Sequence, residues 1–250
     1  MEKFMIGDIA VNSVGYDDIV ALISLTIEQN GKSVIHYVNA ASAVMFRKNP
    51  DLQDAIYNAD LLFPDGTGIF LAAKVLYKNG FKERFNWTDN AYRFIRESEK
   101  QGWRLFFLGA TRQVINKAVA HLEKEYPDLQ IVGYADGYED VKRIDLIKDI
   151  NSSKPNIIWV GMGTPRQEIW IDNNKDLIEC NIFQSVGDIF TFFTGEKIRG
   201  PKVIMRLGFE WLARLIGHPI LYFRRYVMGI PLFVFWVMEQ LVNRLINRQR

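Results

Sequence analysis

The chain has 250 residues, of which 48% are hydrophobic and 24% are charged, and its formal net charge is +2. This composition excludes a disordered or low-complexity protein and predicts one well-filled globular domain, with or without a modest appendage. The single cysteine, Cys180, cannot form an internal disulfide bond or a thiolate zinc site, so we expect a reducing compartment.

The charge is distributed unevenly along the chain. Residues 201–250 contain eight lysines and arginines against two glutamates, so this segment carries +6 and the first 200 residues carry −4. The asymmetry divides the chain into an acidic body over residues 1–200 and a basic appendage over residues 201–250, and it predicts a negatively charged partner for the appendage.

Through residue 200, short apolar runs alternate with longer helical patterns. We predict strands at Val34–Val38, Asp60–Phe63, Arg104–Leu108, Gln130–Tyr134, Asn156–Val160 and Ile182–Val186. We predict helices at Asp17–Gln29, Ala41–Lys48, Gly68–Lys78, Thr88–Gln101, Arg112–Tyr126, Val141–Ser152 and Pro165–Asp176. This alternation is typical of an α/β protein with a mostly parallel, Rossmann-like sheet and flanking helices. Ligands of such sheets bind beyond the carboxyl ends of the strands, so the turns there form the candidate site.

The segment from residue 201 onward shows no strand pattern and holds 8 of the chain's 33 aromatic residues. Pro201, Pro219 and Pro231 divide it into three predicted helices, because proline is tolerated at the start of a helix but not inside it. Its longest uncharged apolar run, Tyr226–Met238, has 13 residues, whereas a membrane-spanning helix needs about 20. We therefore expect this appendage to lie on a membrane rather than cross it, and we expect no targeting segment.

Three kinds of partner remain open for the appendage. Arg214, Arg224 and Arg225 stand among bulky aromatic and aliphatic residues, a pattern that favours an anionic lipid surface. The same apolar residues could form the interface of a homo-oligomer, and arginines could also bind nucleic acid. The density of aliphatic residues in 230–237 favours lipid or protein, so we expect no nucleic-acid partner.

Two turns present a polar side chain directly after a predicted strand. Asn39 follows the first strand and fits either a helix N-cap or a contact to a sugar or base. Asp65 follows the second strand in Pro64-Asp65-Gly66-Thr67-Gly68, where two glycines let a ligand approach the backbone closely. Asp65 fits either a helix-capping residue or a general base, because proton removal requires a carboxylate positioned in a pocket.

Two further turns are typical of phosphate binding. The turns at Gly109 and at Gly161–Gly163 combine small residues with the start of a helix, which supplies unpaired N–H groups and the positive end of the helix dipole. Thr164 and Gln167 also match a capping box, which leaves Glu168 unexplained. Neither turn matches a dinucleotide-binding or Walker motif.

The sequence predicts a site without a metal ion or another cofactor. It lacks Asp-x-Asp, the pair with which many nucleotide-sugar enzymes hold a divalent metal on a diphosphate, and its three histidines are scattered. A diphosphate would then be neutralised by helix termini and arginines, of which Arg84 and Arg166 are nearest to these turns.

The turns and the C-terminal segment together resemble the WecG/TagA/CpsF family of bacterial glycosyltransferases over nearly the whole chain. The motifs that carry the resemblance are Val38-Asn39-Ala40, Pro64-Asp65-Gly66-Thr67-Gly68, Glu83-Arg84 with Thr88-Asp89, Phe107-Leu108-Gly109, Tyr126-Pro127, Ile131-Val132-Gly133, Gly137-Tyr138, Val160-Gly161-Met162-Gly163-Thr164-Pro165-Arg166-Gln167-Glu168-Ile169-Trp170, Arg199-Gly200-Pro201, Glu210-Trp211-Leu212-Ala213-Arg214-Leu215 and Arg224-Arg225-Tyr226. Many ordered matches of this kind are more specific than any single turn.

The resemblance implies an inverting, metal-independent hexosyltransferase that passes a sugar from a UDP-sugar to a polyprenyl-diphosphate-linked saccharide. It implies an enzyme of cell-surface polysaccharide or wall-polymer synthesis, cytoplasmic and peripheral on the inner face of the membrane. It places the catalytic base at Asp65. The residues expected to bind substrate are Asn39, Gly66, Thr67, Arg84, Gly109, Gly161, Gly163, Arg166, Gln167, Glu168 and Thr191, and those expected at the lipid or the acceptor diphosphate are Arg214, Arg224 and Arg225.

Several positions depart from the family pattern. Tyr37 stands where members with N-acetylmannosaminyl activity usually have threonine, and Trp87 replaces a glycine. Asp188-Ile189-Phe190-Thr191 replaces Gly-x-Phe-Asp, and His218-Pro219 replaces Glu-Pro. The changes leave the Asp65 turn and the diphosphate turns intact but alter positions expected to contact the sugar and the base. The expected donor sugar is therefore either N-acetylmannosamine or a plain hexose. The alternatives are a soluble nucleotide-sugar hydrolase or epimerase with an oligomerising tail, and a non-catalytic membrane scaffold.

Overall fold

A parallel sheet of six strands forms the centre of the protein, in the order β4-β3-β8-β7-β5-β6. The computed structural model describes residues 1–195, 227 and 229–248, so Arg214, Arg224 and Arg225 lie outside the described residues. The strands are β3 (Ser33–Val38), β4 (Leu61–Pro64), β5 (Leu105–Gly109), β6 (Ile131–Ala135), β7 (Ile157–Gly161) and β8 (Ile182–Ser185). All six predicted strands are confirmed, with each boundary within one residue of its prediction.

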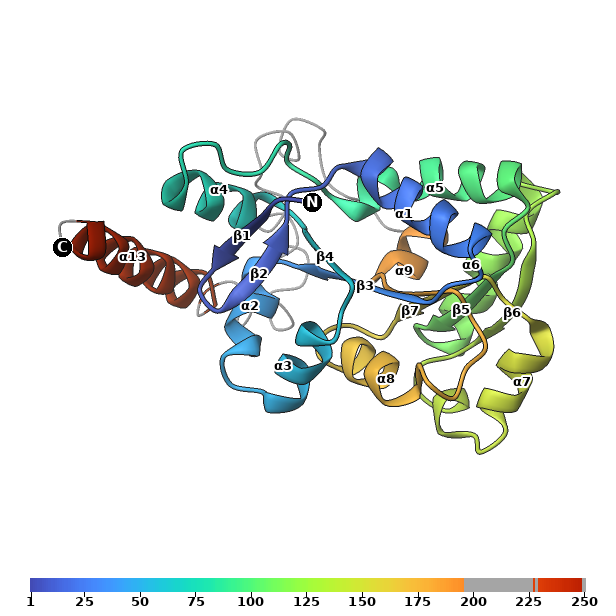
Figure 1. The fold of residues 1–250 in the computed structure, drawn as a ribbon. Helices are drawn as coiled ribbons and strands as arrows, with labels where there is room; N and C mark the ends of the chain where they lie inside the picture. Colours follow the sequence, from blue (N-terminus) through green and yellow to red (C-terminus); the bar gives the residue numbers. More distant parts are fainter. Residues whose placement is uncertain (196–226, 228, 249–250) are drawn as a thin grey trace.

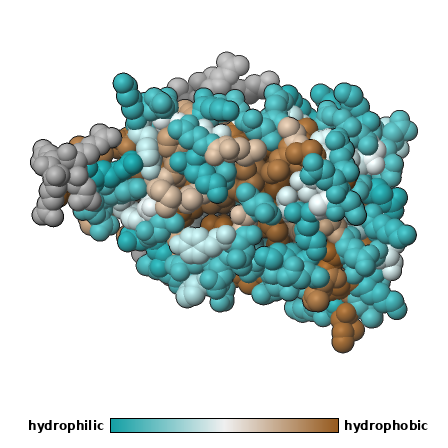
Figure 2. All heavy atoms as spheres, viewed as in Figure 1, coloured by the Kyte–Doolittle hydropathy of each residue, from teal (hydrophilic) through white to brown (hydrophobic). Residues whose placement is uncertain are grey.

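Helices cover both faces of this sheet, which confirms the predicted α/β class (Figure 1). One face packs against α1 (Tyr16–Glu28), α5 (Trp87–Gln101), α6 (Arg112–Glu125) and α9 (Ile189–Phe193). The other face packs against α7 (Leu146–Ser153) and α8 (Arg166–Asn174), and α3 (Pro50–Tyr57) contacts α8. Successive strand residues alternate between these two cores, because side chains of a strand point to opposite faces. Outside, hydrophilic side chains cover most of the face in Figure 2, and hydrophobic ones show mainly in a belt across its middle.

Several short elements were not predicted. They are the antiparallel hairpin of β1 (Lys3–Ile6) and β2 (Ile9–Asn12), and the helices α3 and α9. The predicted helix over 141–152 is instead a 3-10 turn, η1 (Asp140–Lys142), followed by α7. These elements have three to eight residues, too few for a hydrophobic period to identify.

The helix α13 (Gly229–Arg248) packs against the hairpin and against α2 (Ala40–Phe46) and α4 (Thr67–Leu76). Its buried face consists of Phe233, Trp236 and Val237. The Gln240 side chain accepts a hydrogen bond from the Gly7 N–H at 2.7 Å and donates one to the Met5 carbonyl at 2.9 Å. Arg244 donates to the Leu76 carbonyl at 2.8 Å. The part of the appendage that the structure describes is therefore joined to the body by specific contacts.

This helix is longer than the uncharged apolar run predicts. Within it, Gly229–Ile246 has a mean hydropathy of 1.3 over 18 residues, so by length and composition it could cross a membrane. The prediction that the apolar segment is too short to span a membrane was wrong, because the helix continues past the uncharged run through Glu239 and Arg244. Glu239 approaches Arg47 at 4.0 Å, and the Arg244 guanidinium lies 3.9 Å from the centre of the Tyr77 ring. Pro231 is the third described residue of α13, and the expected helix starts at Pro201 and Pro219 lie outside the described residues.

Trp236 anchors α13 to the body. A Cβ atom at position 7 would overlap the Trp236 ring, and the Arg47 guanidinium lies 5.1 Å from the ring centre. We expect Trp236→Ala to weaken docking by roughly 3–5 kcal/mol, the usual cost of removing a buried tryptophan side chain. Hydrogen exchange followed by mass spectrometry should then become faster in residues 229–248 and stay unchanged in the six-stranded sheet.

Phe235→Ala is the matched control, because Phe235 is the neighbouring aromatic residue and its side chain is 69% exposed. Equal acceleration of exchange in both variants would contradict a docking role for Trp236.

Candidate active site

A polar cleft of about 180 Å³ lies at the carboxyl ends of β3, β4, β7 and β8, the sheet edge that the sequence indicates. Among its lining residues are Tyr37, Asn39, Asp65, Thr164 and Asp188. Each of these follows or ends a different strand, except that Tyr37 and Asn39 share β3. The parallel arrangement thus brings together side chains far apart in the sequence.

Asp65 lies directly after β4 and is half-buried. Its Oδ1 accepts a hydrogen bond from the backbone N–H of Trp87 at 3.1 Å, and its own N–H donates to the Val38 carbonyl at 2.8 Å. The N-cap of α4 is Gly66, without a side-chain hydrogen bond. Asp65 is therefore not the N-cap of α4, as one of its two predicted roles required; its carboxylate binds the first N–H of α5 and borders the cleft.

The glycines of the turns fall into two groups. Gly66 and Gly163 have φ of +83° and +77°, and no atom of the described residues lies within 4 Å of the position a Cβ would take. Their backbone is therefore open to approach. Gly109 and Gly161 instead lie against other strand ends: a Cβ at 109 would overlap the Gly161 carbonyl, and one at 161 would lie 2.7 Å from the Gly187 carbonyl oxygen. Close backbone packing explains glycine at both positions, and their contact with a diphosphate stays a prediction.

Asn39 is the N-cap of α2, as one of its two predicted roles required. Its Oδ1 accepts from the N–H groups of Ala41 at 3.1 Å and Ser42 at 3.0 Å. Its Nδ2 makes no hydrogen bond to the part of the chain that the structure describes. Asn39 also lines the cleft, so the cap orients a side chain whose amide nitrogen is available to a ligand.

Gln167 and Glu168 are fully buried beneath the cleft. The Gln167 Oε1 accepts from the backbone N–H groups of Gly163 at 3.2 Å and Gly187 at 3.0 Å. The Gln167 Nε2 donates to the Tyr37 hydroxyl at 3.2 Å and to Glu168 Oε1 at 2.7 Å. All these bonds lie within the protein, so a direct contact of either side chain with substrate stays a prediction.

The capping box predicted at the start of α8 was wrong. The helix begins at Arg166 with Pro165 at the N-cap position and no side-chain cap. The Thr164 hydroxyl instead donates to Glu168 Oε1 at 3.0 Å, and Gln167 turns to Gly163. In a capping box the Thr164 hydroxyl oxygen would accept from the Gln167 backbone N–H, but that N–H donates to the Gly163 carbonyl at 3.2 Å.

Burial raises the pKa of two groups at or beneath this cleft. It raises the pKa of Glu168 to about 7 and, together with the nearby carboxyl groups of Glu168 and Asp65, raises the pKa of Tyr37 to about 12. The Tyr37 phenol therefore stays protonated at neutral pH. Sequence analysis did not identify Tyr37 as a site residue; its departure from the family pattern was the available signal.

Arg84 and Thr191 lie beside the lining residues. Arg84 is exposed, and its Nη1 donates to Thr67 Oγ1 at 3.4 Å, at the turn that carries Asp65. The Thr191 hydroxyl donates to the Asp188 carboxylate, which itself borders the cleft. Thr191 is thus one residue removed from the cleft surface.

Arg166 contacts the loop after β6. Its Nη2 donates to the Gly137 carbonyl at 2.6 Å, and its guanidinium lies 5.1 Å from the centre of the Tyr138 ring. Arg166 is exposed and does not line the cleft. Its predicted contact with substrate therefore stays a prediction, at a place separate from Asp65.

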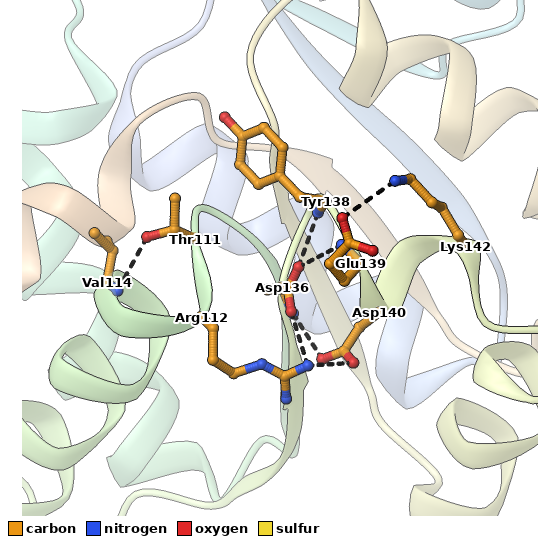
Figure 3. Close-up of polar contacts among 8 residues, drawn as sticks. All are labelled: Thr111, Arg112, Val114, Asp136, Tyr138, Glu139, Asp140 and Lys142. Carbon is orange, nitrogen blue, oxygen red and sulfur yellow. Dashed lines mark hydrogen bonds and ion pairs between the residues drawn. The ribbon is translucent and has the colours of Figure 1, made fainter.

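A charged cluster that the sequence analysis did not identify holds this loop in place (Figure 3). Arg112 pairs with Asp136 at 2.8 Å and with Asp140 at 2.5 Å. Asp136 Oδ1 also accepts from the N–H groups of Tyr138 at 2.9 Å and Glu139 at 2.7 Å. Burial alone would raise the pKa of Asp136, but these backbone donors and Arg112 lower it, so Asp136 is ionised. In Figure 3 the Tyr138 ring points away from the cluster.

One family model matches nearly the whole chain. It describes the glycosyl transferase WecG/TagA/CpsF family and covers residues 4–247. The chain belongs to this family. It is therefore a glycosyltransferase, of the hexosyltransferase type that the sequence motifs predict.

Two curated relatives in this family carry the same name, N-acetylglucosaminyldiphosphoundecaprenol N-acetyl-beta-D-mannosaminyltransferase. The protein from Bacillus subtilis (strain 168) is 30% identical over 218 residues, which cover 87% of this chain and 84% of the relative. The protein from Bacillus spizizenii (strain ATCC 23059 / NRRL B-14472 / W23) is 27% identical over 213 residues, which cover 85% of this chain and 81% of the relative.

The buried carboxyl group of Glu168 makes the stability of this glycosyltransferase depend on pH. A glutamate in the unfolded chain ionises near 4.5, whereas Glu168 in the fold ionises near 7. Between these values the folded protein holds a proton that the unfolded chain has lost, so stability falls as pH rises. We expect the free energy of unfolding of the wild type, relative to Glu168→Gln, to fall by on the order of 3 kcal/mol across this range.

Urea denaturation of both proteins at about pH 5 and about pH 8 measures the effect. The same pH dependence in wild type and variant would contradict the raised pKa.

Proposed function

We propose that this chain transfers a sugar from a UDP-sugar to a polyprenyl-diphosphate-linked saccharide, with inversion at the anomeric carbon and without a metal ion. The donor sugar is N-acetylmannosamine or a hexose. The names of the two relatives support the lipid-linked acceptor and an N-acetylmannosamine donor. The observation that carries the proposal is the position of Asp65, a half-buried carboxylate on a polar cleft of a chain in this family.

The chemistry of the cleft suits a carbohydrate. Asn39, Thr88 and Thr164 place amide and hydroxyl groups on its surface, and Phe192 adds an aromatic ring. Sugar hydroxyls donate and accept hydrogen bonds, and the C–H faces of sugars pack on aromatic rings, so these groups suit a hexose ring.

Asp65 acts as the general base in this proposal. Its carboxylate removes the proton from the acceptor hydroxyl, whose oxygen attacks the anomeric carbon as the bond from that carbon to the UDP oxygen breaks. UDP leaves from the opposite face, so the configuration inverts. The hydrogen bond from the Trp87 N–H holds one carboxylate oxygen in place while the other accepts the proton.

Arginines and helix termini compensate the charge of the leaving diphosphate. Arg84 lies beside the Asp65 turn through its contact with Thr67. Arg214, Arg224 and Arg225 are assigned to the acceptor diphosphate from the sequence alone. The proposal of metal independence rests on the missing Asp-x-Asp motif; among described residues, no group of three or more His, Cys, Asp or Glu side chains could hold a metal ion.

The appendage associates this enzyme with the cytoplasmic face of the membrane, as a peripheral protein. The outward face of α13 is mainly apolar. Its exposed large hydrophobic residues are Leu232, Val234, Phe235, Met238, Val242, Leu245 and Ile246, and Glu239 and Asn243 are exposed among them. Its opposite face is docked on the body, which favours a helix lying at the interface over one that crosses the bilayer. Phe233 lies 3.9 Å from the position a Cβ of Gly68 would take, so this helix begins next to the Asp65 turn.

The division into residues 1–200 and 201–250 stays part of the proposal, because its boundary lies outside the described residues. A homo-oligomer is compatible with it. No observation favours the hydrolase, epimerase or scaffold alternatives, and membership of a glycosyltransferase family favours the transferase.

We expect Asp65→Asn to lower the rate of sugar transfer by roughly 10²–10⁴, the usual contribution of a general base. The asparagine oxygen can still accept from the Trp87 N–H, so the fold should be retained. The measurement is UDP release with a panel of UDP-sugars and a short-chain polyprenyl-diphosphate acceptor. Asp51→Asn, on the exposed side of α3, is the control, and full turnover by Asp65→Asn would remove Asp65 from the mechanism.

Membrane association is tested by co-sedimentation with vesicles of anionic and of neutral phospholipid. We expect the full chain to bind anionic vesicles at low salt and to be released at high salt. Binding should be lost in a variant with Arg214, Arg224 and Arg225 replaced by alanine, and weakened when Phe235, Met238 and Val242 are replaced by serine. Unchanged sedimentation of both variants would exclude the appendage as the membrane-binding element.

A further inference from the structure

The side-chain amide of Gln167 holds three walls of the cleft together. Its oxygen accepts from the N–H groups of Gly163 and Gly187, which follow β7 and β8. Its nitrogen donates to the hydroxyl of Tyr37, on β3. Gly163, Gly187 and Tyr37 all line the cleft.

This arrangement requires one orientation of the amide. If the group turned over, its NH₂ would face the two glycine N–H groups, and donors would oppose donors. The contact between Gln167 Nε2 and Glu168 Oε1, at 2.7 Å, is the shortest of its hydrogen bonds. A carboxyl oxygen that lacks a hydrogen can only accept, so it selects the orientation in which the nitrogen faces it.

Glu168 is itself held by the Thr164 hydroxyl, which donates to the same Oε1 atom at 3.0 Å. Its other oxygen, Oε2, is buried and has no hydrogen-bond partner among the described residues. Burying a carboxyl group with half of its acceptors unused costs free energy. An apolar side chain would fill the space at lower cost, but it would not orient Gln167.

We propose that Glu168 is a positioning residue of the active site, which acts through the Gln167 amide to hold the Gly163 and Gly187 turns and the Tyr37 hydroxyl in their places on the cleft. The proposal rests on the proposed sugar transfer for its effect on rate. Glu168 has no exposed surface in the described structure, so in this proposal it acts through Gln167 rather than on the substrates. Because Tyr37 accepts from Gln167, the phenol proton is directed away from that amide.

The test compares Glu168→Ala with Glu168→Gln in the full chain. A glutamine oxygen can accept from both Thr164 and Gln167, whereas alanine removes both bonds. We expect Glu168→Ala to lower kcat by up to about 100-fold, the effect of a small misplacement of site groups, and Glu168→Gln to restore most of it. Ile171→Ala is the matched control, because Ile171 is fully buried on the same helix outside this network; it should lower stability but not kcat.

A double-mutant cycle with Gln167→Ala tests the route. If Glu168 acts through Gln167, the double variant Gln167→Ala/Glu168→Ala should lose no more activity than Gln167→Ala alone. Losses that multiply would overturn the proposal, and so would a Glu168→Gln variant as impaired as Glu168→Ala, since that result would indicate a role for the carboxyl proton itself.

A spectroscopic readout separates this inference from the proposed function. In protein labelled with ¹⁵N-glycine, the amide signals of Gly163 and Gly187 should shift in Glu168→Ala and keep their positions in Glu168→Gln and Ile171→Ala. Unshifted glycine signals in Glu168→Ala would overturn the positioning role. A wild-type protein that transfers no sugar would overturn the proposed function, while the glycine signals would still decide the role of Glu168.

Discussion

The hydrogen bonds of the buried Gln167 side chain join the ends of β3, β7 and β8, and the shape of the cleft depends on them. A parallel sheet leaves N–H groups unpaired where its strands end, and such groups are costly when buried. Gln167 pairs two of them from within the protein. The walls of the cleft are therefore fixed relative to one another by internal bonds, and in this respect the site is formed before a ligand arrives.

The site also depends on close packing between the backbones of neighbouring strand ends. Gly109, Gly161 and Gly187 lie against one another at the ends of β5, β7 and β8, at distances that leave no room for a Cβ at 109 or 161. Phe190 fills the space beside Gly161. The strand ends are thus densely packed, and among the described residues the turns at Gly66 and Gly163 leave their backbone open.

The two helices that begin at the cleft, α2 and α4, also form the surface on which the C-terminal helix α13 docks. The helices α2 and α4 begin at Asn39 and at the Asp65 turn, and the same two helices bury the inner face of α13. The helix proposed to meet the membrane and the carboxylate proposed as the base therefore belong to one packed unit. This arrangement would let an acceptor anchored in the membrane reach the base without a movement between domains.

The sequence by itself determined the sheet, the sheet edge at which the candidate cleft lies, and the family. The six strands were predictable because buried parallel strands are continuous apolar runs, and Asn39 and Asp65 because polar residues after such runs lie at one sheet edge. The tertiary structure decided the remaining questions. Thr164 and Gln167 match a capping box in the sequence, but in the fold the Thr164 hydroxyl donates to the buried carboxyl group of Glu168. The docking of α13 and the hydrogen bonds of Gln167 depend on contacts between residues distant in sequence. No local sequence pattern encodes such contacts.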